Sequence, residues 1–249
     1  RVTPYDTYSS KIFSKGWILK KLMQLTMWRA NALTCVSKDM VDQYKLIFNN
    51  SKHVYVYNII DDQISRQKMK EKVSHKWLIN KQTPILIAAG RLAPWKGFKY
   101  LIKAFKIIEY KTNAKLIILG DGELRNELLK LIEDLNLSDR IDLPGYVDNT
   151  FKYFVKSDVF VLSSLVEGLP NVLVESMLCG CTPVSTNCPT GPREVLNNGK
   201  YGYIVNMKDE IALAEGIIKA LKMPISEELL NKAIKPFEDK TIIDRHFNI

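Results

Sequence analysis

The sequence has few metal-binding side chains and no long apolar run. Its three histidines and four cysteines show no paired C-x-x-C spacing, so they predict reduced cytosolic thiols rather than a structural zinc site. The longest apolar runs, such as 85–89 and 116–119, are far shorter than the roughly 20 residues of a membrane-spanning helix. The chain starts Arg-Val-Thr-Pro-Tyr-Asp, without Met or a signal-peptide pattern, which predicts a fragment boundary at its front.

The sequence also lacks the motifs of two common ligand classes. No G-x-G-x-x-G follows the first predicted strand of the main sheet, which argues against an ordinary dinucleotide fold. The net charge of +9 is compatible with nucleic-acid binding, but the sequence contains no recognition helix, RNA-binding signature or glycine-rich basic segment. Residues 1–80 carry 14 Lys/Arg against 6 Asp/Glu, so the basic surface belongs to the front third. Nucleic acid is not an expected partner.

The main part of the chain alternates short apolar runs with helical patterns. Strands that are apolar throughout and separated by helices indicate a parallel sheet covered on both faces, so we predict a doubly wound α/β fold. The strands are expected at 85–90, 115–120, 140–145, 158–164, 182–186 and 202–206, and the helices after Lys96, from Glu123, near 150–156, after Pro170, near 192–197 and over 209–221.

The front of the chain predicts part of a second domain. Strands over 31–37 and 52–58 flank one helix, and this Rossmann-like piece is too small to bury its own sheet. A polar, basic stretch over 61–83 follows and marks the boundary. We therefore divide the chain into an N-terminal remnant with its crossover (1–83), a ligand-binding domain (84–222) and two C-terminal helices, joined near Pro236, that pack back toward the front (223–249).

Two cations stand at the expected binding edge of the sheet. Arg91 directly follows a strand and Lys96 directly precedes a helix, whose free N–H groups also favour anions. Such a pair of cations could bind a diphosphate at a site that has no glycine-rich loop. The alternative is that both are ordinary solvated loop cations.

Two glutamates eight positions apart lie at the same edge. Glu167 is expected in the loop after strand 158–164, and Glu175 in the first turn or so of the next helix, where the helix dipole tolerates a carboxylate. Pro170 and Asn171 fix the turn between them. Carboxylates accept hydrogen bonds from sugar hydroxyls, so the pair suits an extended, hydroxyl-rich ligand. The alternative is a helix-capping Glu167 and a solvated Glu175.

Five ordered motifs carry a resemblance to a known family. The motifs are GRLAPWKG (90–97), LGDGELR (119–125), LPGYVDN (143–149), SSLVEGLPNVLVESMLCGCTPVS (163–185) and CPTGPREVLNNGKYGYIV (188–205). In these motifs the chain resembles the C-terminal, donor-binding domain of GT-B glycosyltransferases of the retaining family four. The segments at 34–40 and 55–61 are similar to the end of the same family's N-terminal domain and its crossover.

The resemblance implies roles for individual residues. Arg91 and Lys96 would hold the nucleotide diphosphate and steady its charge as it leaves, in place of a metal ion, so no metal or cofactor is expected. Glu175 would take the ribose hydroxyls and Glu167 would orient the transferred sugar, which makes Glu167, Arg91 and Lys96 the catalytic candidates. Tyr146 and Val147 would lie where the family binds the base. Gly120 to Glu123 would line the floor of the site. The implied donor-binding set is Gly90, Arg91, Lys96, Gly120, Asp121, Gly122, Tyr146, Val147, Glu167, Gly168, Leu169, Pro170, Asn171, Val172 and Glu175.

The implied reaction moves a hexose or N-acetylhexosamine from a nucleoside diphosphate sugar, foremost a UDP-sugar, to a glycan or lipid-linked acceptor, with retention, in polysaccharide or lipopolysaccharide biosynthesis. The loop Gly191 to Glu194, expected to face the same cleft, is similar to members that use galactose-type or N-acetylated hexoses. Because 1–83 matches only the end of the N-terminal domain, the fragment is expected to bind donor without necessarily turning over. A non-catalytic sugar-nucleotide-binding subunit and a GT-B-fold epimerase are the alternatives.

The stretch 11–30 has two interpretations. Its cationic residues alternate with aromatic and aliphatic ones, as in helices that bind anionic membrane surfaces, and this would place the protein on the cytoplasmic side, peripherally at the inner face of the membrane. It also fits an ordinary helix of the N-terminal domain with its apolar side packed on a sheet. The cations are Lys11, Lys15, Lys20, Lys21 and Arg29, and the apolar residues are Phe13, Trp17, Leu22, Leu25 and Trp28.

Overall fold

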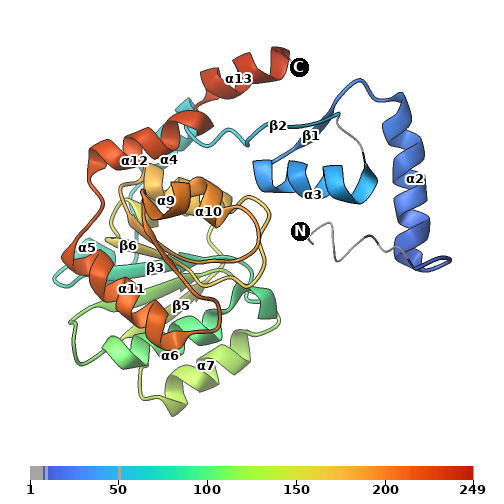
Figure 1. Cartoon of the computed structure of the whole chain (residues 1–249). Coiled ribbons are helices and arrows are strands. Elements are labelled where there is room, and N and C mark those ends of the chain that lie inside the picture. The colour runs from blue at the N-terminus through green and yellow to red at the C-terminus, as the bar shows by residue number, and fades with distance from the viewer. Residues whose placement is uncertain (1–7, 9–10, 50–51, 249) are drawn as a thin grey trace.

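The main body is a six-stranded sheet in which every neighbouring pair of strands runs parallel. The computed structural model describes residues 8, 11–49 and 52–248, so the predicted fragment boundary at residues 1–6 lies outside the described residues. The strand order is β5-β4-β3-β6-β7-β8, and Figure 1 shows this sheet within the main body. The strands are β3 (Ile85–Ala89), β4 (Lys115–Leu119), β5 (Ile141–Gly145), β6 (Val159–Leu162), β7 (Thr182–Thr186) and β8 (Tyr203–Val205).

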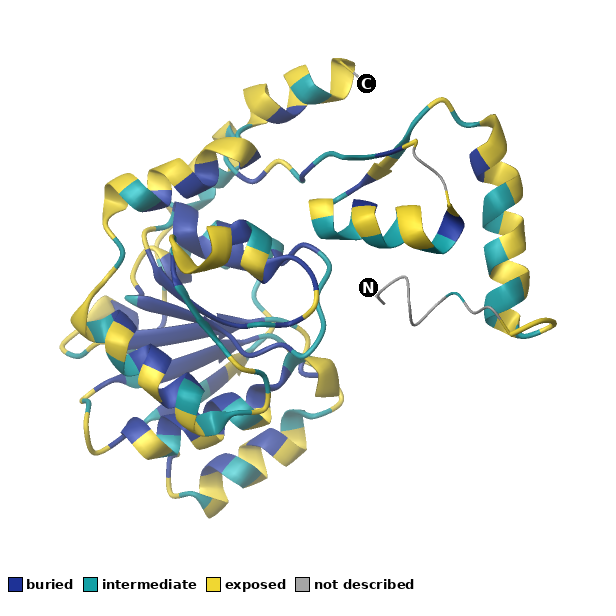
Figure 2. Cartoon of the chain, viewed as in Figure 1, coloured by how far each residue is buried: buried dark blue, intermediate teal, exposed yellow. Residues whose placement is uncertain are grey.

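Both faces of this sheet are covered by helices, which confirms the doubly wound α/β prediction. Alternate residues of β3 enter opposite cores: Ile87 packs with one cluster and Leu86 with the other, and both are fully buried. This is why the strands are apolar throughout. Figure 2 shows the buried sheet between helices whose outer faces are exposed. One core includes α8 (Phe151–Phe154), α9 (Asn171–Leu178) and α12 (Glu227–Ile234), and the other includes α6 (Phe98–Ile108), α7 (Arg125–Asp134) and α11 (Glu210–Lys222).

The strand order places a switch point in the middle of the sheet. From β3 the chain adds β4 and β5 on one side, and then returns to add β6, β7 and β8 on the other side. The loops that leave β3 and β6 therefore run in opposite directions from adjacent strand ends. In such sheets ligands bind in the crevice outside these ends.

The front segment lies to one side of the main body (Figure 1). Its strands β1 (Leu33–Cys35) and β2 (His53–Tyr55) pair in parallel, and α3 (Lys38–Phe48) connects them. Helix α2 (Lys15–Arg29) precedes them and buries Met27. Ser14 and Ser37 accept backbone hydrogen bonds at the starts of α2 and α3, which explains where both helices begin.

The stretch 61–83 holds two short helices that pack on the main body. Helix α4 (Gln63–Lys68) ends where Asn149 Nδ2 donates a hydrogen bond to the Lys68 carbonyl at 3.0 Å. Just before α5 (Lys76–Ile79), His75 Nε2 lies 2.8 Å from Asp142 Oδ2, and within α5 Leu78 is buried. These contacts attach the stretch to the main body, whereas composition alone groups it with the front segment.

The C-terminal tail lies against the crossover. After α12 the chain forms η3 (Lys235–Phe237) and α13 (Asp239–Phe247). The Phe237 ring stacks on Tyr57 with centroids 4.6 Å apart, and its carbonyl accepts from the Ile60 amide at 3.0 Å. Arg245 Nε donates to the Tyr55 carbonyl at 2.7 Å. The crossover after β2 and the C-terminal tail thus lie side by side between the front segment and the main body.

Candidate functional site

The loop after β3 is pressed against the end of β6. It contains η1 (Pro94–Lys96), and Gly97 follows with a φ of 66°. A Cβ on Gly97 would lie 2.1 Å from the Ser163 carbonyl oxygen, so only glycine permits this approach. Ser163 Oγ donates to the Lys96 carbonyl at 2.9 Å. The two contacts fix Lys96 at the switch point of the sheet.

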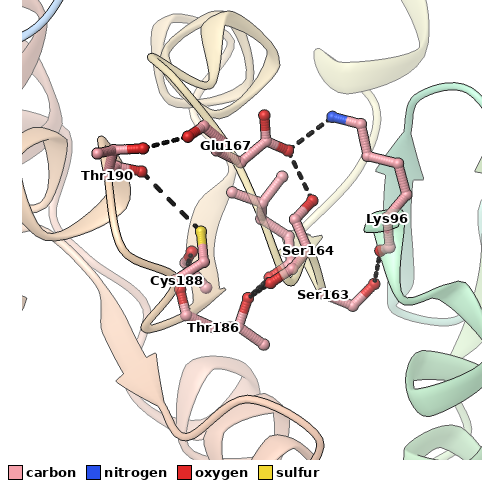
Figure 3. A network of polar contacts seen from close by, with 9 residues as sticks. Lys96, Ser163, Ser164, Glu167, Thr186, Cys188 and Thr190 are labelled. Carbon is pink, nitrogen blue, oxygen red and sulfur yellow. Dashed lines mark hydrogen bonds and ion pairs between the residues drawn. The ribbon is translucent and has the colours of Figure 1, made fainter. Parts of the chain in front are cut away.

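Lys96 and Glu167 form an ion pair at this point (Figure 3). The Lys96 ammonium lies 2.6 Å from Glu167 Oε1, and Ser164 Oγ donates to the same oxygen at 2.6 Å. Their side chains are only 18% and 10% exposed, so solvent screens the pair weakly. Thr190 Oγ1 donates to the Glu167 backbone carbonyl and holds the loop. Glu167 is thus a positioned carboxylate and not a helix cap.

Two adjoining pockets open at this edge. We call them the Glu167 pocket and the Tyr146 pocket. They share Val172, and the loop after β3 lines both. The Glu167 pocket is lined by Trp95, Lys96, Val166, Glu167, Gly168, Leu169, Pro170, Asn171 and Val172. The Tyr146 pocket is lined by Gly90, Arg91, Leu119, Gly120, Asp121, Tyr146, Val147, Thr150 and Val172.

The two predicted cations line different pockets. Lys96 faces the Glu167 pocket, whereas Arg91 lines the Tyr146 pocket and lies 3.1 Å from Glu123 through its Nε. Both members of the Arg91–Glu123 pair are well exposed. A hydrogen bond from its own backbone amide, with Arg91 adding to it, holds the pKa of the Glu123 carboxyl below its usual value. A ligand that spans the two pockets would pass between both cations.

Glu175 lies behind the Tyr146 pocket. It is the fifth residue of α9, at the start of the second turn, so it lies just beyond the first turn near which it was predicted. Its Oε2 accepts from Thr150 Oγ1 at 3.5 Å, and Thr150 lines the pocket. Burial raises the pKa of Glu175, opposed by Thr150 and by Lys68. A desolvated carboxylate with one long hydrogen bond has capacity to accept further donors.

Replacing Glu175 with glutamine is expected to raise the free energy of unfolding by about 1 kcal/mol at pH 7, because a partly buried charge is removed. Because the pKa of Glu175 is raised above the ordinary 4.5 in the folded state, the free energy of unfolding of the wild type is highest below pH 4.5 and falls as pH rises through the raised pKa. The glutamine variant lacks this loss, so its advantage over the wild type should shrink as pH falls. Urea unfolding of both proteins between pH 5 and 8 would test this. A gap between them that widens as pH falls would contradict it.

The structure brings most of the predicted donor-binding residues to the two pockets. Glu175 and Gly122 are not among the lining residues: Gly122 instead packs on the backbone of Leu92. The sequence prediction missed Trp95, Val166, Leu119 and Thr150 in the linings, and Ser164 and Thr190 as supports. Trp95 lies inside the GRLAPWKG motif, which was the available signal.

The loop predicted to face the same cleft through Gly191 and Glu194 is only partly so placed. Gly191 packs on the wall of the Glu167 pocket at Gly168. Glu194, in α10 (Pro192–Val195), points instead to the front segment, where it accepts from the Lys38 amide. The prediction of a cleft-facing Glu194 is therefore wrong.

Two further properties of the described residues bear on the predictions. All four cysteines are free thiols, and burial raises the pKa of Cys179 and Cys188 to about 12. Within residues 8, 11–49 and 52–248, no group of three His, Cys, Asp or Glu side chains is arranged to hold a metal ion. In the same residues no helix has both the length and the apolar character needed to cross a bilayer.

Sequence comparison identifies a family and several relatives. The model of the family described as "Glycosyl transferases group 1" matches residues 69–236. The chain is 32% identical over 237 residues to a Campylobacter jejuni N-acetylgalactosamine-N,N'-diacetylbacillosaminyl-diphospho-undecaprenol 4-alpha-N-acetylgalactosaminyltransferase, covering 94% of this chain and 61% of that protein. It is 34% identical over 160 residues to the Rhizobium meliloti lipopolysaccharide core biosynthesis glycosyltransferase LpsE, covering 64% and 45%.

Structure comparison finds the same architecture in solved structures. Anabaena HepE in complex with UDP matches with a TM-score of 0.81 and 20% sequence identity, over 97% of this chain and 69% of that one. At this identity the likeness shows a shared fold, which is that of GT-B proteins. The chain spans about three fifths of the length of the Campylobacter relative.

Proposed function

Because this chain belongs to the group 1 glycosyltransferase family, we propose that it forms the donor half of an enzyme that transfers a hexose or N-acetylhexosamine from a UDP-sugar, with retention. The observation that carries the proposal is a pair of adjoining pockets at the carboxyl ends of the strands, one at the β3–β6 switch point and the other at the ends of β3, β4 and β5. One holds a lysine-paired carboxylate and the other an arginine beside apolar walls. Such a layout suits a ligand with a flat base, an anionic middle and a hydroxyl-rich end.

Each part of the donor has a partner of suitable chemistry. In this proposal the base lies against Tyr146, the ribose reaches Glu175 past Thr150, and the sugar hydroxyls donate to Glu167. The diphosphate lies between Arg91 and Lys96, which stabilise its charge when the glycosidic bond breaks. With these two cations the proposed reaction needs no metal ion or cofactor.

The acceptor is proposed to be a glycan or lipid-linked saccharide. The Campylobacter relative's name specifies an undecaprenol-linked acceptor and N-acetylgalactosamine transfer, which supports both an N-acetylhexosamine donor and a lipid-linked acceptor. On α2 and just before it, Phe13, Leu22, Leu25 and Trp28 are exposed beside several lysines, while Met27 packs inward. We include peripheral contact of this surface with anionic lipid on the cytoplasmic side in the proposal.

Calorimetric titration of the chain with UDP tests the donor site. Replacing Arg91 with alanine is expected to weaken UDP binding about tenfold, because one charge-assisted contact to the diphosphate is lost. Arg29→Ala, on the exposed surface of α2, serves as the matched control and should leave the affinity unchanged. A folded wild-type chain that does not bind UDP would refute the proposed nucleotide, and equal loss in both variants would refute the role of Arg91.

A further inference from the structure

A carboxylate of the main body caps a helix of the front segment. Glu194 Oε1 and Oε2 accept from the Lys38 backbone amide at 2.9 and 3.0 Å, and Oε2 also accepts from the Asp39 amide at 3.2 Å. Both amides belong to the first turn of α3, whose N–H groups have no partner within the helix. Negative charge there is stabilised by the helix dipole as well. Glu194 thus completes the local cap: Ser37 accepts from the Met40 amide, and Glu194 accepts from the two amides before it.

Tyr57 adds a third donor from the crossover. Its hydroxyl donates to Glu194 Oε1 at 2.5 Å, and its side chain is almost fully buried. Burial raises the pKa of Tyr57, with the Glu194 hydrogen bond adding to the effect, so the phenol stays protonated and remains a donor. Removal of the carboxylate would leave this buried hydroxyl and two amides without their acceptor.

The contact is reciprocated from the front segment. Asp39 Oδ2 accepts from the Gly191 amide at 3.0 Å, so each segment contributes one carboxylate to the other. Gly191 has a φ of 87°, and a Cβ there would lie 2.2 Å from the Gly168 carbonyl oxygen. One residue earlier, Thr190 Oγ1 donates to the Glu167 carbonyl. The loop 190–194 is therefore packed between the start of α3 and the wall of the Glu167 pocket.

We propose that Glu194 and Asp39 form a latch that positions the front segment against the wall of the Glu167 pocket for transfer. Neither residue is among the lining residues of the two pockets, so both are positioning residues, and their role in catalysis rests on the proposed function. The latch fixes α3, and with it the front segment, relative to Glu167, the carboxylate proposed to orient the sugar. Small misplacement of reacting groups lowers turnover strongly without changing the binding of either substrate alone.

Hydrogen exchange on the chain tests the latch directly. In Glu194→Ala the amides of Lys38 and Asp39 are expected to exchange about tenfold faster or more, with UDP affinity within twofold of wild type. Glu228→Ala, which removes an exposed carboxylate paired with Lys232, is the control and should change neither. Unchanged exchange at Lys38 and Asp39 would overturn the latch.

Kinetics of the enzyme that contains this chain tests its role in transfer. Glu194→Ala is expected to lower kcat about tenfold with the donor KM within twofold, and Glu194→Gln, which keeps one acceptor oxygen, to be intermediate. Adding Asp39→Ala to Glu194→Ala should cause little further loss, because the two act as one unit. Wild-type kcat in Glu194→Ala, or full additivity, would overturn the proposal. Failure of the wild type to bind UDP would instead refute the proposed function.

Discussion

Replacing Gly97 with alanine is expected to lower the free energy of unfolding by about 4 kcal/mol, the largest stability loss among the substitutions considered. The added Cβ would lie 2.1 Å from the Ser163 carbonyl oxygen, which is backbone and cannot rotate away. Gly97 also has a φ of 66°, which costs other residues about 1 kcal/mol or more. The loop after β3 would have to leave the end of β6, and mutations that force such backbone shifts belong to the most destabilising class.

Gly180→Ala separates the steric clash from the backbone strain. Gly180 has a φ of 89°, but no described atom lies within 4 Å of the position that an added Cβ would take. This variant should therefore lose only about 1 kcal/mol. Urea unfolding followed by far-UV circular dichroism measures both. Equal losses in the two variants would show that the approach of Gly97 to β6 contributes nothing.

Under the proposed function, replacing Glu167 with glutamine is expected to lower kcat for glycosyl transfer by about 10²-fold or more. The variant keeps the size of the side chain but loses the negative charge that pairs with Lys96 at 2.6 Å. A preorganised group of this kind typically contributes two to three orders of magnitude to turnover. UDP affinity should change only a few-fold, because the proposed contacts of Glu167 are to the transferred sugar. Steady-state transfer assays and calorimetry separate the two effects.

Glu109→Gln provides a matched control for Glu167→Gln. Glu109 is also a poorly exposed carboxylate, and it pairs with Lys106 at 2.5 Å on the side of the sheet covered by α6. Its replacement should cause a comparable change in stability and leave kcat within twofold. If both variants lose turnover equally, the effect of Glu167 reflects stability and not its place in the pocket.

The sequence predicts the main sheet well because its strands are buried on both faces. The run Ile85–Ala89 is apolar at every position. An amphipathic helix would place polar residues on its outer face within the same length, so the run predicts a buried strand. The strand order, with β3 beside β6, does not follow from any local pattern because pairing is a tertiary property. Helices α4 and α5 were missed because, at 6 and 4 residues, they are too short to show a helical period, and they depend on tertiary contacts such as that of His75 with Asp142.

In the candidate site, too, local patterns predict some residues, whereas others depend on tertiary contacts. Motif position correctly placed Lys96 and Glu167 at one edge, since both lie in loops that follow predicted parallel strands. It could not place Glu194, because the capped amides of α3 lie more than 150 residues away in the chain. Thr150 and Ser164 were missed because small hydroxyl residues at strand and helix ends are common, and only their hydrogen bonds to carboxylates distinguish them.

The central position of the β3–β6 pair bears on the order of folding. A crossover that contains α6 connects β3 to β4, and one that contains α9 connects β6 to β7, whereas Leu86 meets Val159 across a much longer stretch of chain. Contacts at large sequence separation carry the greatest loop-closure cost, so we expect two half-sheets to form before they unite at this seam. The Glu167 pocket lies on the seam, whereas the Tyr146 pocket is lined mostly from the ends of β3, β4 and β5 and includes Val172 from beyond β6. A ligand that spans both pockets would then bind only the united sheet, and its presence would slow unfolding without accelerating the early assembly of either half.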